Sequence, residues 1–469
     1  MGYKRIPVTI VKHPDYKERE KQLITINDAC SPTGVKDAGR KYLPNPGDVN
    51  NQIDIEKYNN YHNRAIYYGF SGQTVRAMAG LAFMKGVTVA DVQTGVEYIN
   101  TDIDGDRLGI EQSMKASFTS TYRDGRAGLL VDFPPTEGML TRAQQEAIGA
   151  KSIIRRYDAL QIANWHTTKV GANDVLSLVS LFEVNDEVFE DGITVQRVGV
   201  ERRLILEDGV YRVEIYHDGA FVEAYEPRIN GQTLGYIPFF FIGAENNDSR
   251  FDDSPMYPIC ELNIGHYRNS ADYEDSVFML RPQPWASGLT QTWYDENLKG
   301  FRFGSGSLFP LPEGGSFGIE QPSPNDQAYE AMQYKQKSMV ALGAKHLTGE
   351  LSYNTATEAM IGEAGSNSVV QTVIDNVEQA YNDALAVLAE FMGESIAPVV
   401  VVNTDLANIV SDSNTANLMV SAWMGGLIGK EDARSYFRKT GLVDRTDEEI
   451  DEDIALNLIG NDNTDNTNP

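Results

Sequence analysis

Three aspartates at alternate positions, Asp102, Asp104 and Asp106, form the most chemically suggestive pattern in the sequence. Alternate carboxylates open an EF-hand calcium loop, but Arg107 stands where that loop requires glycine and Ser113 where it requires a bidentate glutamate. Asp102 and Asp104 could instead serve as the acid and base of a glycoside-cleaving enzyme, which needs paired carboxylates. We favour a third interpretation, in which these carboxylates cap a turn and the helix that follows it.

A second pattern, Gly314–Gly318, matches the nucleophile elbow G-x-S-x-G with Ser316 at its centre. That motif presents its serine at a turn between a buried strand and a helix. Here Pro310 and Pro312 interrupt the preceding segment, and the next helix starts only near Ser323. A glycine turn in a loop is therefore favoured over a serine hydrolase.

The remaining chemistry-bearing residues match no cofactor or metal motif. The histidines show no H-E-x-x-H pattern and no grouping with cysteine, and we interpret His266 as a helix residue with satisfied hydrogen bonds. The two cysteines, Cys30 and Cys260, exclude a disulfide scaffold and make a reducing, intracellular origin the default. The glycine-rich run Gly425–Lys430 is followed by Glu431, where a Walker A loop requires Ser or Thr. We expect no cofactor and no metal.

Composition describes a large, acidic protein. Its 469 residues are typical of about three domains, and Lys plus Arg number 40 against 67 Asp plus Glu, a formal net charge of −27. Such a surface repels phosphate backbones, which disfavours sequence-reading nucleic-acid binding but suits a conduit that lets DNA pass without sticking. The longest apolar run, Ala397–Val402, is too short to span a bilayer, and the N-terminus matches no export or lipidation signal, so no membrane association is expected.

The elements that must position these residues divide into a mixed first half and a helical second half. The first half is expected to contain a polar, irregular arm over residues 1–50, helices over 55–68, 75–82 and 109–123, and a buried strand over 127–135. Residues 175–241 are rich in Val, Ile, Tyr and Phe and carry three Asp-Gly pairs, which predict tight hairpin turns in an antiparallel sheet. These pairs are Asp191-Gly192, Asp208-Gly209 and Asp218-Gly219.

The second half predicts two long helices around an insert. One helix runs over 254–280 and the other from the Ser323-Pro324 cap to about 346. The insert over 281–322 is expected to be compact and non-helical. Its aromatic residues lack the interleaved Arg and Lys of a nucleic-acid groove, so we favour core or subunit contact over base stacking. They are Trp285, Trp293, Tyr294, Phe301 and Phe303.

A loop over 347–366 leads to the most regular helix in the sequence. Its apolar residues alternate in steps of four and three, which predicts a narrow seam packed lengthwise on a neighbouring helix. The seam includes Val370, Ile374, Val377, Tyr381 and Leu388. A β-run near 399–402, helices over 418–427, 430–440 and 447–458, and a disordered tail complete the expected elements.

This order of elements resembles the portal proteins of tailed bacteriophages, in particular their short subgroup. The resemblance covers roughly residues 40–455 and depends on the order of several segments, none diagnostic alone. They are RAIYYGFSGQTVRAMAGLAFMKG, INTDIDGDRLGIEQ, GRAGLLVDFPP, LGYIPFFFIGAENND and ELNIGHYRNSADYEDS.

The resemblance implies an α+β portal fold in a ring, usually of twelve subunits, around a DNA channel at one capsid vertex. The parts it implies are a wing over 1–253 and 367–396, a stem of helices 254–280 and 323–346, a clip over 281–322, a tunnel loop over 347–366 and a crown over 397–469. A hairpin of two helices cannot bury both of its faces alone, so ring assembly also has a physical reason.

The implied function is a virion protein, not an enzyme, assembled in the host cytoplasm for DNA packaging, retention and ejection. Its implied partners are the major capsid protein, the terminase large subunit, a head–tail connector and double-stranded DNA that passes non-specifically. The implied channel residues are Asn354, Thr355, Thr357 and Glu358 in the tunnel loop and the lysines Lys335, Lys337 and Lys345. The insert aromatics would dock partners, and the seam would serve subunit or helix packing. Another virion ring protein is the alternative, ahead of a carboxylate or serine hydrolase.

Overall fold

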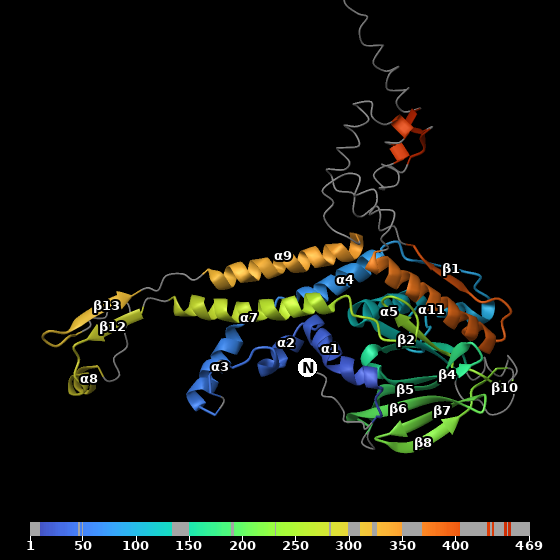
Figure 1. The fold of residues 1–469 in the computed structure, drawn as a ribbon, viewed down its shortest axis with the longest axis horizontal. Helices are drawn as coiled ribbons and strands as arrows, with labels where there is room; N and C mark the ends of the chain where they lie inside the picture. The colour runs from blue at the N-terminus through green and yellow to red at the C-terminus, as the bar shows by residue number, and fades with distance from the viewer. Residues whose placement is uncertain are drawn as a thin grey trace, which may run out of the picture.

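The computed structural model describes fourteen stretches of the chain. These are residues 10–45, 47–48, 50–133, 150–188, 192–229, 231–280, 283–298, 310–320, 326–348, 368–403, 429–431, 434–435, 445–447 and 449–451. The fold mixes helix and sheet, as expected for an α+β protein. A body of packed helices and sheets carries two long helices that project to one side (Figure 1).

Residues 14–41 are largely helical, so the expectation of an irregular arm over 1–50 is wrong for this segment. Pro14 starts α1 at a position that needs no backbone N–H, and His13 Nδ1 accepts a hydrogen bond from the Asp15 N–H at 3.2 Å. Only a few widely spaced side chains, such as Leu23 and Ile26, are buried, so the pattern is too sparse to stand out in the sequence. The elements are α1 (Pro14–Cys30), α2 (Gly34–Asp37), η1 (Gly39–Lys41), α3 (Gln52–Arg64) and α4 (Phe70–Ala82).

The centre of the body is a three-stranded antiparallel sheet in the order β11-β2-β3. Every residue of β2 is buried, which confirms the predicted buried strand, and α5 precedes it as predicted. The segment comprises β1 (Val87–Ala90), η2 (Thr94–Asn100), α5 (Ile110–Asp124), β2 (Arg126–Asp132) and β3 (Ile153–Asp158).

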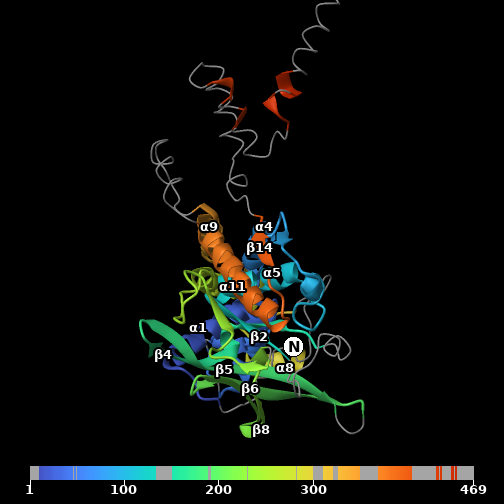
Figure 2. The same cartoon turned by 90° about the vertical axis from the view of Figure 1, so that its right-hand side faces the viewer.

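A five-stranded antiparallel sheet, β4-β5-β6-β7-β8, lies on the opposite side of the body from α11 (Figure 2). Two predicted Asp-Gly turns are confirmed: φ is +51° and +77° at Asp208 and Gly209, and +47° and +82° at Asp218 and Gly219. Asp191 lies outside the described residues. The strands are β4 (Ile162–Val170), β5 (Asn173–Val188), β6 (Val195–Glu207), β7 (Val210–His217) and β8 (Ala220–Tyr225), preceded by η3 (Ala159–Gln161) and followed by β9 (Arg228–Ile229), β10 (Gln232–Thr233) and β11 (Phe239–Gly243).

The helix α11 (Val369–Phe391) lies across the central sheet and α5. The expectation of a narrow seam packed lengthwise on one helix is wrong, because Val373, Ala380 and Leu385 are buried as well and widen the apolar face to fit a sheet. The structure places the predicted seam in the core of a single chain. Tyr381 is fully buried there, and its hydroxyl lies 2.6 Å from Ser113 Oγ and 3.0 Å from Ser117 Oγ.

After α11 the chain forms β14 (Val399–Val402), which pairs antiparallel with β1 and agrees with the predicted β-run. The predicted C-terminal helices are described only in part. The residues assigned as helical there are 430–431, 434–435, 447 and 449–451. Arg434 and Asp451 form an ion pair at 2.7 Å between the two predicted helices 430–440 and 447–458. The predicted helix 418–427 and the tail lie outside the described residues.

The two projecting helices are α7 (Tyr257–Met279) and α9 (Gln327–Thr348), and His266 is buried where α7 leaves the body. The rings of Tyr68 and Phe70 meet the imidazole edge-on, with centroids 5.2 and 5.3 Å away. Burial lowers the pKa of His266, and the charge of Lys335 lowers this pKa further. The expected satisfied histidine is not found, because Nδ1 has no hydrogen-bond partner among the described residues.

We expect Tyr381→Phe to lower the free energy of unfolding by about 1–2 kcal/mol, because it leaves two buried serine hydroxyls without their common partner. Urea denaturation followed by circular dichroism measures the change. Tyr334→Phe is the matched control, since the Tyr334 side chain is 72% exposed, and it should change stability by less than about 0.5 kcal/mol. Equal losses in both variants would contradict the role of the buried hydroxyl.

A second prediction concerns acid stability. The folded state disfavours the protonated form of His266, whereas the unfolded state takes up this proton near pH 6.5. The free energy of unfolding therefore decreases as the pH falls below about 6.5. The variant His266→Gln should lose less stability than the wild type between pH 7.5 and 5. His166→Gln, at an exposed position on β4, should keep the wild-type dependence. Identical slopes in all three proteins would refute the prediction.

Candidate functional site

The most distinctive feature of the molecule is the hairpin formed by α7 and α9, which lie side by side and carry a small tip beyond the body (Figure 1). The buried side chains of α7 all fall between Ile259 and Ala271, and none occurs over 272–279. The first half of α7 is therefore part of the body, while its second half extends outside it. This hairpin corresponds in position to the predicted stem, and its tip to the predicted clip.

Contacts between the two helices fix their spacing. Lys335 Nζ donates a hydrogen bond of 2.5 Å to Asn269 Oδ1, and its aliphatic chain lies over Gly265, where an added Cβ would come within 3.0 Å of Lys335 Cε. The rings of Tyr273 and Tyr329 pack with centroids 5.7 Å apart. Lys335 is thus half-buried between the helices, whereas Lys337 is exposed.

The outer half of α7 is braced on one side by α3. The Tyr61 hydroxyl donates a hydrogen bond to the Asp272 carboxylate at 2.6 Å. Burial raises the pKa of Tyr61, and the hydrogen bond and charge of Asp272 raise this pKa further. Arg64 forms an ion pair with Asp275, and its guanidinium lies 4.2 Å from the ring centroid of Phe278. These contacts hold the hairpin at a fixed angle to the body.

The rest of the hairpin surface carries exposed apolar side chains. Val277 and Met279 on α7 are 44% and 55% exposed, and Tyr334 and Val340 on α9 are 72% and 66% exposed. A soluble helix pair normally turns polar residues outward, so this surface is suited to contact with another protein. Sequence analysis expected an unburied face on this hairpin but did not name these residues, although the run VFML at the end of α7 is too continuous for a helix with a single apolar face.

The tip is a β-hairpin with a short helix. The expectation of a non-helical insert is wrong, because Thr290 caps a helix by accepting a hydrogen bond from the Trp293 N–H at 3.3 Å. Trp285 is 47% exposed and lies across Gly318, where an added Cβ would come within 2.8 Å of the indole. Tyr294 is equally exposed. The elements are β12 (Gln283–Ser287), α8 (Gln291–Asn297) and β13 (Ser316–Glu320).

Ser316 does not occupy a nucleophile elbow. It begins β13 at the exposed end of the tip hairpin, and its hydroxyl lies 2.7 Å from Ser287 Oγ. Gly314, with φ of +83°, forms the turn before it. This supports the glycine-turn interpretation.

Several predicted site residues lie outside the described residues. They are Phe301, Phe303, Asn354, Thr355, Thr357 and Glu358. Lys345 belongs to α9, but its side chain is not described. Of the insert aromatics, Trp285 lies on β12, and Trp293 and Tyr294 lie on α8, where Trp293 is half-buried.

The aspartates of the 102–106 segment act as turn caps. Asp102 accepts a hydrogen bond from the Arg107 N–H at 2.8 Å, and its ion pair with Lys151 lowers the pKa of this carboxyl. Asp104 accepts from the Asp106 N–H at 2.8 Å. Because Asp102 and Asp104 are engaged by these partners, the two carboxylates do not form an acid–base pair around a substrate.

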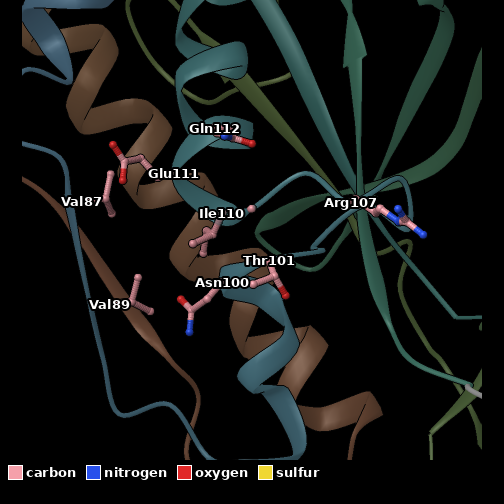
Figure 3. A pocket seen from close by; sticks show the side chains of 9 residues that line it. Val87, Val89, Asn100, Thr101, Arg107, Ile110, Glu111 and Gln112 are labelled. Carbon is pink, nitrogen blue, oxygen red and sulfur yellow. The ribbon is translucent and has the colours of Figure 1, made fainter.

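A pocket of about 370 Å³ lies beside this turn, between β1 and the start of α5. Glu111 points toward Val87, while Arg107 points away from the other lining side chains (Figure 3). The other residues that line the pocket are apolar or neutral, and none is a nucleophile with an adjacent base. Within the described stretches no group of three His, Cys, Asp or Glu side chains is placed to hold a metal ion, and no helix there is long and apolar enough to cross a membrane.

Comparison with known proteins links the hairpin region to one family model. Residues 255–392, from α7 through the tip to α11, match a domain of unknown function, DUF4055. A search of curated proteins finds no match.

Three solved structures are similar to the chain at low identity. A chain in the virion of a native gene transfer agent (GTA) particle is 12% identical, with a TM-score of 0.39 and 87% of this chain and 98% of that chain covered. A chain in the neck of the native GTA particle, computed with C12 symmetry, is 12% identical, with a TM-score of 0.37 and coverages of 79% and 90%. A chain in the neck of the empty GTA particle, computed with C6 symmetry, is 11% identical, with a TM-score of 0.37. The match covers 80% of this chain and 94% of that chain.

Proposed function

We propose that this chain is a structural ring subunit of a phage-like particle and, more specifically, its portal protein. The observation that carries the proposal is the projecting hairpin, which is anchored in the body at one end and carries exposed apolar side chains on α7 and α9. The order of sequence segments that resembles portal proteins supports the same reading. A capsid or tail-tube subunit would share the acidity and the ring, but the helix, insert, helix order argues against it.

The exposed apolar side chains of the hairpin support ring assembly. A lone pair of helices leaves Tyr334 and Val340 in water, whereas neighbouring copies around a closed ring would cover them. Each copy would offer one side of its hairpin to the next, so the contact is heterologous and closes by rotation. A dodecamer at one capsid vertex, in contact with the major capsid protein, is the specific form proposed.

The charge of the chain suits a passive DNA channel. Twelve copies at −27 each sum to −324, and an acidic wall does not retain phosphate backbones. Lys337, exposed on α9, is the described lysine best suited to face the duplex, while the half-buried Lys335 serves the helix pair. The tunnel loop is proposed to bring four residues to the narrowest point of the channel: Asn354, Thr355, Thr357 and Glu358. Packaging, retention and ejection of DNA would use this channel, in particles assembled in the host cytoplasm.

The proposed role is non-catalytic. Asp102 and Asp104 are engaged as turn caps, and the Ser316 hydroxyl is engaged by Ser287. The terminase large subunit would supply the motor and would dock, as the head–tail connector later does, on the exposed aromatic residues of the tip.

The first functional prediction is that the purified protein forms closed rings visible by negative-stain microscopy and countable by mass photometry. Val340→Glu should reduce the ring fraction at least tenfold, because it places a charge in the proposed apolar contact. Val170→Glu is the matched control, since Val170 is 61% exposed against 66% for Val340 but lies on β4. A folded wild-type protein that stays monomeric at micromolar concentration, or equal effects of both variants, would contradict the ring.

The second prediction separates docking from assembly. The double variant Trp285→Ala and Tyr294→Ala should still form rings but bind the terminase large subunit and the head–tail connector of the same phage at least tenfold more weakly, measured by biolayer interferometry. Phe221→Ala on β8, where the side chain is 58% exposed, is the control and should bind normally. Undiminished binding by the double variant would refute the docking role of the tip.

A further inference from the structure

Strand β1 has one edge that no other described strand covers. β1 pairs with β14 on its other side, and within the described stretches these two strands form a sheet of their own. The sequence of β1 is Val-Thr-Val-Ala, so it carries neither the lysine nor the proline that often protects an exposed strand edge. Its outer main-chain groups are therefore open to pairing with another chain.

The hydrogen bonds between the two strands show which residues of β1 face this edge. The Asn403 N–H donates to the Gly86 carbonyl at 3.1 Å, so these two residues form a hydrogen-bonded pair just beyond the end of the ladder. Bonded and non-bonded pairs alternate along an antiparallel ladder, so Val87 and Val89 belong to non-bonded pairs. The N–H and C=O groups of Val87 and Val89 therefore point away from β14, toward the open edge.

The opposite edge of the sheet is already covered by α11. The Val400 N–H donates to Asn382 Oδ1 at 2.8 Å, and Asn382 Nδ2 donates to the Val400 carbonyl at 3.0 Å. The Val402 N–H donates to Glu378 Oε2 at 2.9 Å. Side chains of α11 thus replace a further strand beside β14, whereas Val87 and Val89 have no such partners among the described residues.

The pocket of about 370 Å³ lies beside β1. Its walls include Val87 and Val89 on one side and, on the other, Asn100 at the end of η2 and Ile110 and Glu111 at the start of α5 (Figure 3). Residues that lie opposite one another on neighbouring strands point to the same face of a sheet. A strand added beside β1 would therefore place alternate side chains next to those of Val87 and Val89, on the pocket face.

The charge of the pocket suits a basic side chain. Glu111 is exposed and points toward Val87, and a Cβ added to Gly86 would lie 3.7 Å from its Oε1. Arg107 is the basic residue of the lining, and its side chain points away from the others. Asp91, directly after β1, is a second exposed acid. Because the whole chain carries a net charge of −27, a basic partner is favoured over a second copy.

We propose that β1 and this pocket bind an extended, basic segment of a partner protein by strand addition. The segment pairs with the N–H and C=O groups of Val87 and Val89, which supply affinity for any extended backbone. A Lys or Arg of the segment, placed beside Val87, reaches the Glu111 carboxylate and supplies selectivity. This inference does not rest on the proposed function, because it requires only the folded chain.

The probe is a fluorescein-labelled, amidated heptapeptide, Thr-Val-Thr-Lys-Thr-Val-Thr. Its sequence reads the same in both directions, so it can pair as a parallel or an antiparallel strand, and it places Val, Lys and Val on one face. Fluorescence anisotropy with the full-length protein should give a Kd below about 1 mM. The peptide with Glu in place of Lys should bind about fivefold more weakly.

One pair of variants tests the main-chain contact. Val89→Pro removes an N–H that β14 does not use, so the strand should still form, while the peptide should bind about tenfold more weakly. Val89→Ala is the matched control, because it shortens the side chain and keeps the N–H, and it should lose no more than about threefold. Circular dichroism checks that both variants are folded. Equal binding by the two variants would overturn strand addition.

A charge reversal tests the role of Glu111. Glu111→Lys should bind the Glu peptide more tightly than the Lys peptide, whereas Glu223→Lys, at an exposed acid on the edge strand β8, should keep the wild-type preference. The proposal is also overturned if neither peptide binds the wild type at about 1 mM, or if Glu111→Lys keeps the wild-type preference. Self-association of the wild type that Val89→Pro abolishes would assign this edge to a second copy and would equally refute the basic partner.

Discussion

The structure depends on one constraint: α7 is a single continuous helix that is buried in the body at its start and exposed at its end. Polar ties fix the buried half, since the Ser270 hydroxyl donates to the Ile66 carbonyl at 2.7 Å and Arg268 donates to the Tyr42 carbonyl at 2.9 Å. A helix transmits this orientation along its length because its backbone hydrogen bonds leave little freedom to bend. The body therefore sets the direction of the whole hairpin, and the tip is held at a defined distance from it.

Sequence patterns predicted those elements whose signals are local. The Asp-Gly turns depend on the conformation of two residues, and both described examples have the positive φ angles that the pattern requires. The helix α1 went unrecognised because its few buried side chains, among them Tyr16 and Leu23, are separated by charged residues. For α11 the periodicity indicated a helix correctly, but the width of its apolar face depends on whether a helix or a sheet lies opposite, which no local pattern records.

The sequence predicted the order of the elements that form the candidate site, but not the contacts between their side chains. Two long helices around an insert could be inferred from helix periods and proline positions. The half-buried state of Lys335 depends on Gly265 and Asn269, 70 and 66 positions earlier, which lie beside it only after folding. Such juxtapositions follow from tertiary packing, so a single sequence carries no signal of them.

In the proposed ring, charge and apolar contact act against each other. Each copy carries −27, so bringing copies together is opposed by a repulsion that salt screens within about 10 Å at 0.1 M ionic strength. Burying a side chain such as Val340 contributes about 1.5–3 kcal/mol and is insensitive to this screening. The acidity thus disfavours loose association at every surface, whereas close contact along the hairpin gains enough apolar burial to offset it. In the proposed ring, this balance favours an assembly that covers the exposed apolar side chains of the hairpin.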